Sequence, residues 1–398
     1  MHVAGRIIGL PVLEDAAVSL RPPAILLLGL LILAPFAAVA APLPHFTQPN
    51  AIWNQDVSSA TLRSNSAQMM QHLEDLASSI RGSSCVAAGK GSVCWGDTRV
   101  FNFQIDLSFY ALHADAGTPT AAVVAWPVDP SDPSDHYYYG ECDDPGAQTQ
   151  FPLPVGGGAD GTNPPDYTCD ASGDDCHVLV VNDATHVLWE SYNTAYLDGG
   201  GLHTRCALHW YLDRVYPRHG RGEHCTSADG AGFPIAPLLF NADEVWAAAQ
   251  VQGDLGHAIR FILGNNRMME GKYVHPSSHG TSATKDTDVN AVPYGSRLRL
   301  KSSFNVAGFS SNEGVRVILR TLQKYGMFLS DGGGIPLTGE ADDFDDHKWD
   351  SDLGMDTHSL FGIRPTDFDV IEAGDPRSIS GDCTRTPDDF VFIDGNEY

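Results

Sequence analysis

Seven short segments rich in β-branched and aromatic residues recur along the chain, and each is bounded by Gly, Pro, Asp or Asn. This spacing is typical of strands joined by tight turns. No regular alternation of strand and helix accompanies them, which argues against a doubly wound parallel sheet. The pattern predicts a mainly β protein of antiparallel sandwich or jelly-roll type. The segments are 100–105, 121–126, 177–181, 186–191, 206–213, 258–263 and 297–301.

A few peripheral helices accompany these strands. Apolar residues at helical spacing predict one helix over 64–82 and a second from about Glu313 to Tyr325. A short third helix is predicted to start at Asn241, because acidic residues follow it in what would be the first turn. The segment 177–191 favours a hairpin of two strands with its turn near residue 182.

Residues 1–40 have the features of a secretory signal peptide. An apolar run over 24–34 is followed by small residues that end at Ala40. Since a spanning helix needs about 20 apolar residues, the run predicts a cleaved signal and no transmembrane anchor after cleavage. Residues 41–398 are then expected to form a single secreted β-rich domain.

Eight cysteines follow the predicted cleavage site, and an even number in an exported chain favours disulfides. Short loops favour Cys85 with Cys94, Cys169 with Cys176, and Cys206 with Cys225. No CxxC pair supports a zinc–thiolate site. The segment 130–176, rich in Pro, Gly and Asp, is expected to be a long loop region held by disulfides.

The formal net charge of −26 limits the classes of partner. Nucleic-acid binding draws on an excess of Lys and Arg, which this chain lacks. The same charge is unsuited to an anionic membrane surface.

Two carboxylates have a setting typical of glycoside hydrolases. Glu190 ends a predicted strand beside Trp189, and Asp229 lies in a glycine-containing loop. In glycoside hydrolysis one carboxyl group protonates the leaving oxygen and the other attacks or activates water. A purely structural role is the alternative, with Glu190 paired to a cation and Asp229 capping a turn.

Histidines at strand ends are a second candidate set. His257 and His279 each neighbour a Gly- or Ser-containing bend next to a predicted strand, and His177 begins another strand. They could act as a general base and its partner, or bind a metal through neutral imidazole. Each could equally make a single structural hydrogen bond.

Three cations alternate along one predicted strand. Arg297, Arg299 and Lys301 would project from one face, with Tyr294 just before them. Arginine matches carboxylate groups with two parallel hydrogen bonds, so the row would suit a uronate or sulfated sugar. The alternative is neutralisation by the protein's own carboxylates, for which the acidic segment 339–352 is the candidate.

The same acidic segment makes calcium a candidate cofactor, although its spacing does not match an EF-hand loop. No cofactor is certain from the sequence. The proposed ligands are Asp342, Asp343, Asp345 and Asp346.

Six motifs spread over residues 173–373 resemble a family of secreted bacterial proteins to which no activity is assigned. They are GDDCHVLVV, TSADGAGFPIAPLLFNADEV, GHAIRFIL, YVHPSSH, GSRLRLK and LQKYGMFLSDGG. The resemblance implies a single secreted β-rich domain. Upstream, the segment GECDDPGAQTQFPLPVGGGADG departs from the family pattern.

Together these features predict a secreted carbohydrate-active enzyme with an extracellular glycan as its partner. A hydrolase would use Glu190 and Asp229, and a lyase would use His257, His279 and the basic row. The alternative is a non-catalytic glycan-binding or cell-envelope protein, in which the aromatic residues and cations only bind.

Overall fold

The computed structural model describes residues 44–81, 95, 102–126, 136–168, 176–197 and 200–385. All of them belong to one compact unit, Ala40–Tyr398. The predicted signal peptide and the expected pairs Cys85 with Cys94 and Cys169 with Cys176 fall at least partly outside these ranges. In the described ranges, no helix combines the length and hydrophobicity needed to span a bilayer.

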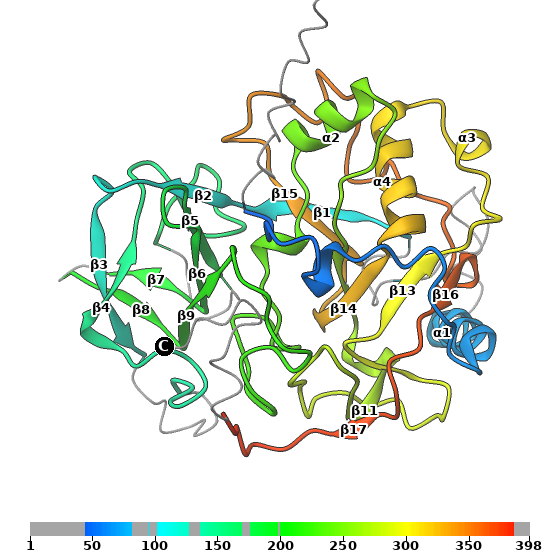
Figure 1. The fold of residues 1–398 in the computed structure, drawn as a ribbon, viewed down its shortest axis with the longest axis horizontal. Helices are drawn as coiled ribbons and strands as arrows, with labels where there is room; N and C mark the ends of the chain where they lie inside the picture. Colours follow the sequence, from blue (N-terminus) through cyan, green and yellow to red (C-terminus); the bar gives the residue numbers. More distant parts are fainter. Residues whose placement is uncertain are drawn as a thin grey trace, which may run out of the picture. The chain divides into compact units, whose positions relative to one another are not determined.

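The largest sheet has six strands in the order β1-β15-β10-β14-β13-β16 (Figure 1). Its outer pair β1·β15 and its central pair β10·β14 are parallel, whereas β13 runs antiparallel to both of its neighbours. The strands are β1 (Ile105–Phe109), β10 (Ile259–Leu263), β13 (Arg297–Leu300), β14 (Met327–Gly332), β15 (Leu337–Glu340) and β16 (Phe368–Val370).

Two four-stranded sheets have the orders β2-β5-β6-β9 and β4-β3-β8-β7, and a three-stranded sheet has the order β12-β11-β17. The predicted hairpin is confirmed, since β5 and β6 pair antiparallel in continuous register. The strands are β2 (Ala111–Ala114), β3 (Thr120–Ala125), β4 (Gly146–Pro152), β5 (Val178–Asn182), β6 (Val187–Tyr192), β7 (Ala195–Tyr196), β8 (Leu202–Thr204), β9 (Cys206–Tyr211), β11 (Met268–Tyr273), β12 (Val292–Tyr294) and β17 (Arg377–Ser378).

The mainly β prediction is confirmed, but every sheet is mixed, because each contains at least one parallel pair. The finer sandwich or jelly-roll assignment stays a prediction. Two predictions about individual segments were wrong. The first strand begins at Ile105, where the alternation in IDLSF starts, and the loop region 130–176 contains β4.

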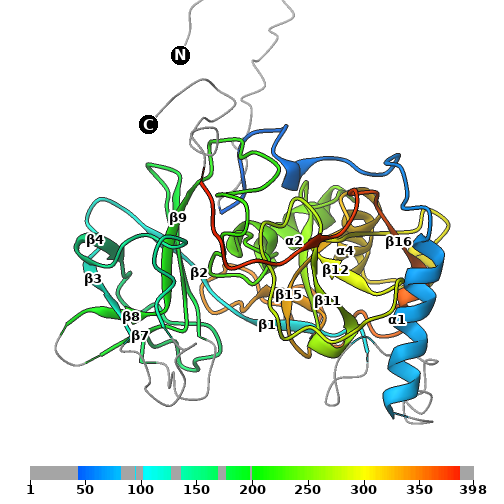
Figure 2. The same ribbon diagram turned by 90° about the horizontal axis from the view of Figure 1, so that it is seen from below.

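Four α-helices occur in the described residues: α1 (Ser66–Arg81), α2 (Ala242–Gln250), α3 (Val306–Phe309) and α4 (Glu313–Lys324). Helix α2 begins with a capping box between Asn241 and Glu244, and Asn312 caps α4. Helix α4 packs on β13 and against α2 (Figure 1), while α1 packs on β16 (Figure 2). The three predicted helices are therefore confirmed.

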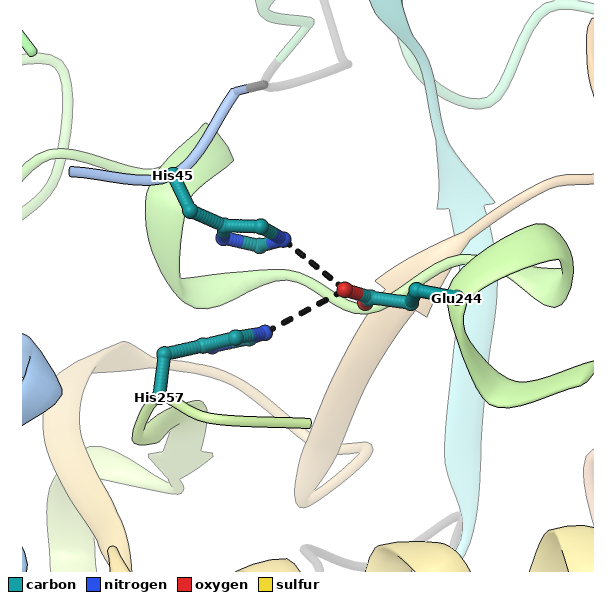
Figure 3. Close-up of side chains that lie close together, drawn as sticks. All are labelled: His45, Glu244 and His257. Atoms are coloured by element: carbon teal, nitrogen blue, oxygen red, sulfur yellow. Dashed lines mark hydrogen bonds and ion pairs between the residues drawn. The ribbon is translucent and has the colours of Figure 1, made fainter. Parts of the chain in front are cut away.

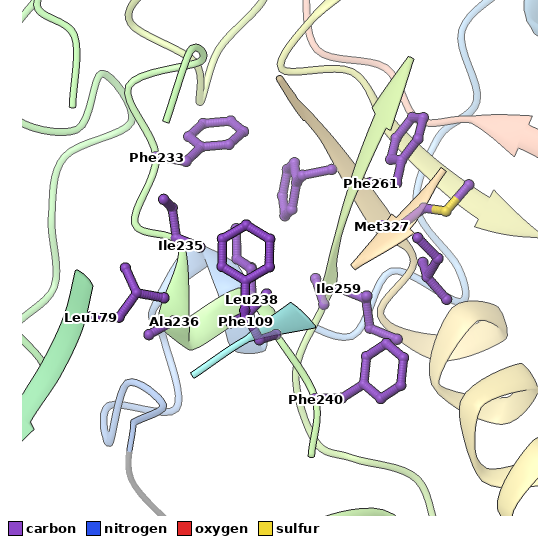
Figure 4. Close-up of a cluster of buried hydrophobic side chains, with 14 of the residues drawn as sticks. Phe109, Leu179, Phe233, Ile235, Ala236, Leu238, Phe240, Ile259, Phe261 and Met327 are labelled. Carbon is purple, nitrogen blue, oxygen red and sulfur yellow. The ribbon is translucent and has the colours of Figure 1, made fainter. Parts of the chain in front are cut away.

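The segment 233–240 is buried at every residue. It contributes to one core with side chains of β1, β5, β10 and β14, such as Phe109, Leu179, Ile259 and Met327 (Figure 4). Burying such side chains stabilises a fold by about 1.5–3 kcal/mol each.

Disulfides join Cys142 to Cys206 and Cys225 to Cys383. The predicted pair of Cys206 with Cys225 is therefore wrong. A short loop favoured that pair in the sequence, but the fold brings each cysteine to a partner that is distant along the chain. Cys176 is also disulfide-bonded.

Candidate active site

A cavity of about 560 Å³ lies where seven segments of the chain, mostly loops and strand ends, meet. This volume is in the range of small-molecule sites. Its walls are mainly polar, and two tyrosines, Tyr138 and Tyr192, contribute aromatic surface. The other lining residues are Thr226 to Gly230, Asn265, His279 to Ser282, Asp331, Gly332 and Ile379 to Gly381.

A buried ion pair lies at the wall of this cavity. Arg260 of β10 donates two hydrogen bonds to Asp229, from Nε to Oδ2 (3.1 Å) and from Nη2 to Oδ1 (2.9 Å). A third goes to Thr338 Oγ1 at 3.0 Å. The side chain of Asp229 is completely buried, so only this paired geometry offsets the cost of removing the charge from water.

A second carboxyl group, Asp331 at the end of β14, lies against the first. Its Oδ2 is 3.8 Å from Nη2 of Arg260, and its side chain is 25% exposed. Burial raises the pKa of Asp229 to about 8, and Asp331 acts in the same direction through its charge and a hydrogen bond, whereas Arg260 opposes both. Burial and the neighbouring carboxyl group of Asp331 therefore favour the protonated form of Asp229 over the opposing effect of Arg260.

Gly230 positions Asp331 and His279 at once. Its N–H donates to Asp331 Oδ2 at 3.0 Å, and its carbonyl accepts from His279 Nδ1 at 3.0 Å. A Cβ atom on Gly230 would lie 2.5 Å from Asp331 Oδ1, so only glycine permits this approach.

The hydrogen bond from Nδ1 fixes the tautomer of His279, because a carbonyl can only accept. In the neutral ring, Nε2 is then the basic nitrogen. Burial lowers the pKa of His279 from its ordinary value of 6.5, which keeps the ring neutral at pH 7. His279 therefore has the protonation state of a general base.

Tyr294, predicted to bind substrate, is buried and donates to Asp331 Oδ1 at a long 3.4 Å. Burial raises the pKa of its hydroxyl, and the charge of Asp331 adds to this effect. Tyr294 therefore stays protonated and supports the carboxyl pair.

Glu190 has a different environment from the one expected for a catalytic acid. It is fully buried, and its Oε1 accepts from the N–H groups of Ile235 (2.7 Å) and Ala236 (2.9 Å). Its Oε2 accepts from Trp210 Nε1 at 3.0 Å. Burial raises the pKa of Glu190 to about 7 against the effect of these three donors. Glu190 ties the buried segment 233–240 to β6 and does not line the cavity.

Two other predicted residues also lie outside the cavity lining. Trp189 is partly buried, with its ring against those of Phe151 and His209. His257 packs with His45 and Glu244. His177, the third histidine considered, is buried with Nε2 3.1 Å from the Ala228 carbonyl.

The basic row binds main-chain oxygens. Arg297 donates to the carbonyls of Tyr325, Ile52 and Gln55 at 2.7–3.2 Å. Burial lowers the pKa of Arg297 to about 9.

Arg299 donates to the carbonyls of Val57 (2.6 Å) and Ser58 (2.7 Å) and contacts Asp369 Oδ2 at 3.4 Å. Lys301 donates to the Thr366 carbonyl at 2.6 Å. The acidic segment 339–352 supplies none of these acceptors. Its predicted role as the partner of the row is therefore wrong.

The carboxylates of the acidic segment do not form a cation cage. Asp342 Oδ2 accepts from the Trp349 N–H at 2.7 Å, and Asp345 Oδ2 accepts from the Ala242 N–H at 3.0 Å. Lys348 Nζ donates to the Asp342 and Asp345 carbonyls.

Asp343 and Asp346 are exposed. Among the described residues, the one group of three His, Cys, Asp or Glu side chains placed to hold a metal is His45, Glu244 and His257. The four predicted calcium ligands are not part of it.

Sequence reasoning found Asp229, His279 and Tyr294 but missed Arg260 and Asp331. A single arginine inside the apolar segment AIRFIL was a usable signal, because a buried guanidinium needs a buried acceptor. Asp331 carried no comparable signal.

No protein-family model, curated protein or solved structure matches this chain. The resemblance of residues 173–373 to an uncharacterised secreted family therefore stays a prediction.

Proposed function

We propose that this protein is a secreted enzyme that hydrolyses a neutral glycan in the cavity. The observation that supports this most is that Gly230 contacts both Asp331, whose neighbour Asp229 is favoured in its protonated form, and the neutral His279. An acid that keeps its proton at neutral pH, next to a base that has lost its own, is the combination that general acid–base catalysis requires.

In this reaction His279 Nε2 takes a proton from a water molecule as the water oxygen bonds to the anomeric carbon. The glycosidic C–O bond breaks, and the carboxyl pair gives its proton to the leaving oxygen through Asp331, its more exposed member. Transfer of the proton from His279 back to the pair, through solvent, restores the starting state. Arg260 and Tyr294 position the pair. Because the two carboxyl groups touch, they do not act as the separated acid and nucleophile of a retaining glycosidase.

A neutral substrate fits the cavity better than a uronate does. None of the described residues that line the cavity is a lysine or arginine. The cations predicted to neutralise a uronate, Arg297, Arg299 and Lys301, bind other parts of the chain. Hydrolysis is therefore favoured over the lyase reaction, which depends on that neutralisation.

Turnover on a panel of neutral and uronic polysaccharides tests this function, with new reducing ends and the absorbance of unsaturated sugars as readouts. We expect reducing ends from a neutral glycan, and a loss of about 10²–10⁴-fold in kcat for Asp331→Asn and for His279→Gln. The matched controls are Asp343→Asn and His113→Gln, at exposed positions.

Full activity of the Asp331→Asn variant would contradict the mechanism. Binding of a glycan without turnover on any substrate would replace it with the non-catalytic glycan-binding function.

A further inference from the structure

A second cluster of side chains, placed so that they could hold a metal ion, consists of His45, Glu244 and His257 (Figure 3). The three residues come from the N-terminal segment, from the first turn of α2 and from the residues just before β10. Nε2 of His45 is 2.9 Å and Nε2 of His257 is 3.4 Å from the same oxygen, Oε2 of Glu244. All three side chains are at least nine-tenths buried.

Main-chain contacts set the tautomers of both histidines. Nδ1 of His45 lies 2.9 Å from the Pro237 carbonyl, and Nδ1 of His257 lies 2.9 Å from the Ala258 carbonyl. Each Nδ1 must carry the hydrogen, because a carbonyl only accepts. In the neutral rings both Nε2 lone pairs then point at a carboxylate oxygen, so three acceptors converge in a buried space.

Three converging acceptors repel one another unless a cation or additional protons lie between them. A proton on His45 alone would serve its 2.9 Å contact with Glu244 but leave the Nε2 lone pair of His257 facing the same oxygen at 3.4 Å, and protonating both imidazoles would stack two positive rings, whose centroids are 3.8 Å apart. A bound metal ion satisfies all three acceptors with the rings neutral. Hydrogen bonds from Nδ1 to main-chain carbonyls are also what metal-binding histidines commonly make.

A second contact holds the carboxylate of Glu244 in place. The other oxygen of Glu244, Oε1, already accepts from the Asn241 N–H at 2.9 Å. This contact anchors the carboxylate and leaves Oε2 for the ion.

We propose that His45, Glu244 and His257 bind one divalent transition-metal ion, with zinc as the best match, through the two Nε2 atoms and Oε2. Two imidazoles and one carboxylate form a common zinc ligand set, with bonds of about 2.0–2.2 Å. Because Oε2 lies between the two nitrogens, loading requires this oxygen to withdraw and the rings to turn slightly. The bound ion ties the N-terminal segment to α2 and β10. This site shares no residue with the proposed active site, so either can exist without the other.

Zinc binding to the full-length purified protein tests the proposal. After chelation and dialysis, titration with ZnCl₂ should give one site per chain, and the melting temperature should rise with zinc concentration by mass action. Cobalt chloride in place of zinc should give the visible absorption of a four-coordinate nitrogen- and oxygen-ligated ion.

Glu244→Gln is the decisive variant. Its amide oxygen can still accept from the Asn241 N–H, and its NH₂ group can donate to the imidazoles, so the fold is retained while the anionic ligand is lost. Zinc affinity should fall by more than about 100-fold, beyond the loss typical of outer-shell changes. His257→Phe is the second variant, since phenylalanine keeps the stacked ring without a ligand atom.

The matched control is His113→Gln, which removes an exposed histidine paired with Asp183 and should leave the zinc titration unchanged. Absence of a stoichiometric zinc site in the wild-type protein would overturn the proposal. So would zinc binding that survives both Glu244→Gln and His257→Phe, because such binding would come from other side chains.

Discussion

Replacement of Arg299 by methionine separates a structural from a ligand-binding role for the basic row. Arg299 is 8% exposed and donates to the Val57 and Ser58 carbonyls at 2.6 and 2.7 Å, with Asp369 at 3.4 Å. Methionine fills much of the same volume but donates no hydrogen bond. The Val57 carbonyl then keeps only its bond from the Ala60 N–H (3.0 Å) and loses its charged donor, while the mostly buried carboxylate of Asp369 loses its cationic partner.

The expected loss can be estimated group by group. Loss of the hydrogen bond from the charged guanidinium to the buried Val57 carbonyl costs about 1.5–3 kcal/mol. The exposed Ser58 can bond to water in place of Arg299, so its carbonyl adds little. Together with the unpaired Asp369, the variant should lose about 3 kcal/mol of its free energy of unfolding.

Urea unfolding of the two proteins measures this loss. With a slope near 3 kcal/mol/M, the midpoint should fall by roughly 1 M at unchanged slope. Lys285→Met is the matched control, because it removes one positive charge at an exposed position and should leave the free energy of unfolding within about 0.5 kcal/mol of wild type. If Arg299→Met proved as stable as this control, the row would be free to bind an anion and our structural explanation would be refuted.

Three further outcomes are expected. The pH profile of kcat/KM should be bell-shaped: activity falls in acid as His279 gains a proton, with an apparent pKa below 6.5, and falls in base near pH 8 as Asp229 loses its proton; activity that still rises above pH 9 would contradict the acid role. Glu190→Gln should cost about 1–3 kcal/mol in urea unfolding while the activity per folded molecule stays unchanged, since an amide NH₂ would face an N–H donor; lost activity at full stability would restore Glu190 as a catalytic candidate. Gly230→Ala should displace Asp331 and lower kcat by about 100-fold, whereas the control Gly117→Ala, where a Cβ meets only an ordinary contact at 3.4 Å, should not.

The helices could be predicted because their determinants are local. Asn241 and Asn312 cap helices through N–H groups three residues further along the chain, so the pattern and the structure are parts of the same short segment. The partners of strands are not local. Nothing near Ile105 indicates that β1 pairs in parallel with β15, and the mixed sheets could not be derived from alternation alone.

For the candidate site, too, residues with a local sequence signal could be predicted, but their distant partners could not. Asp229 and His279 each follow or precede a bend rich in small residues, which identified them as loop residues available for chemistry. Their environment depends on Arg260 and Asp331, which lie 31 and 102 residues away from Asp229 in the sequence, and only the fold brings them together. The basic row was similar: its alternation was evident, but most acceptors of Arg297 and Arg299 lie about 240 residues upstream, and the acceptor of Lys301 lies 65 residues downstream.

The pairing of β1 with β15 and the contacts of Arg297 and Arg299 with residues 52–58 constrain the order in which the chain can acquire its structure. During synthesis on the ribosome, the N-terminal segment and β1 appear long before β13 and β15. The last strand of the six-stranded sheet to appear is β16, at residues 368–370. The six-stranded sheet therefore cannot close until nearly the whole chain has been synthesised. Since non-local pairing slows folding, β1 and the N-terminal segment lack their partners in this sheet until synthesis is nearly complete.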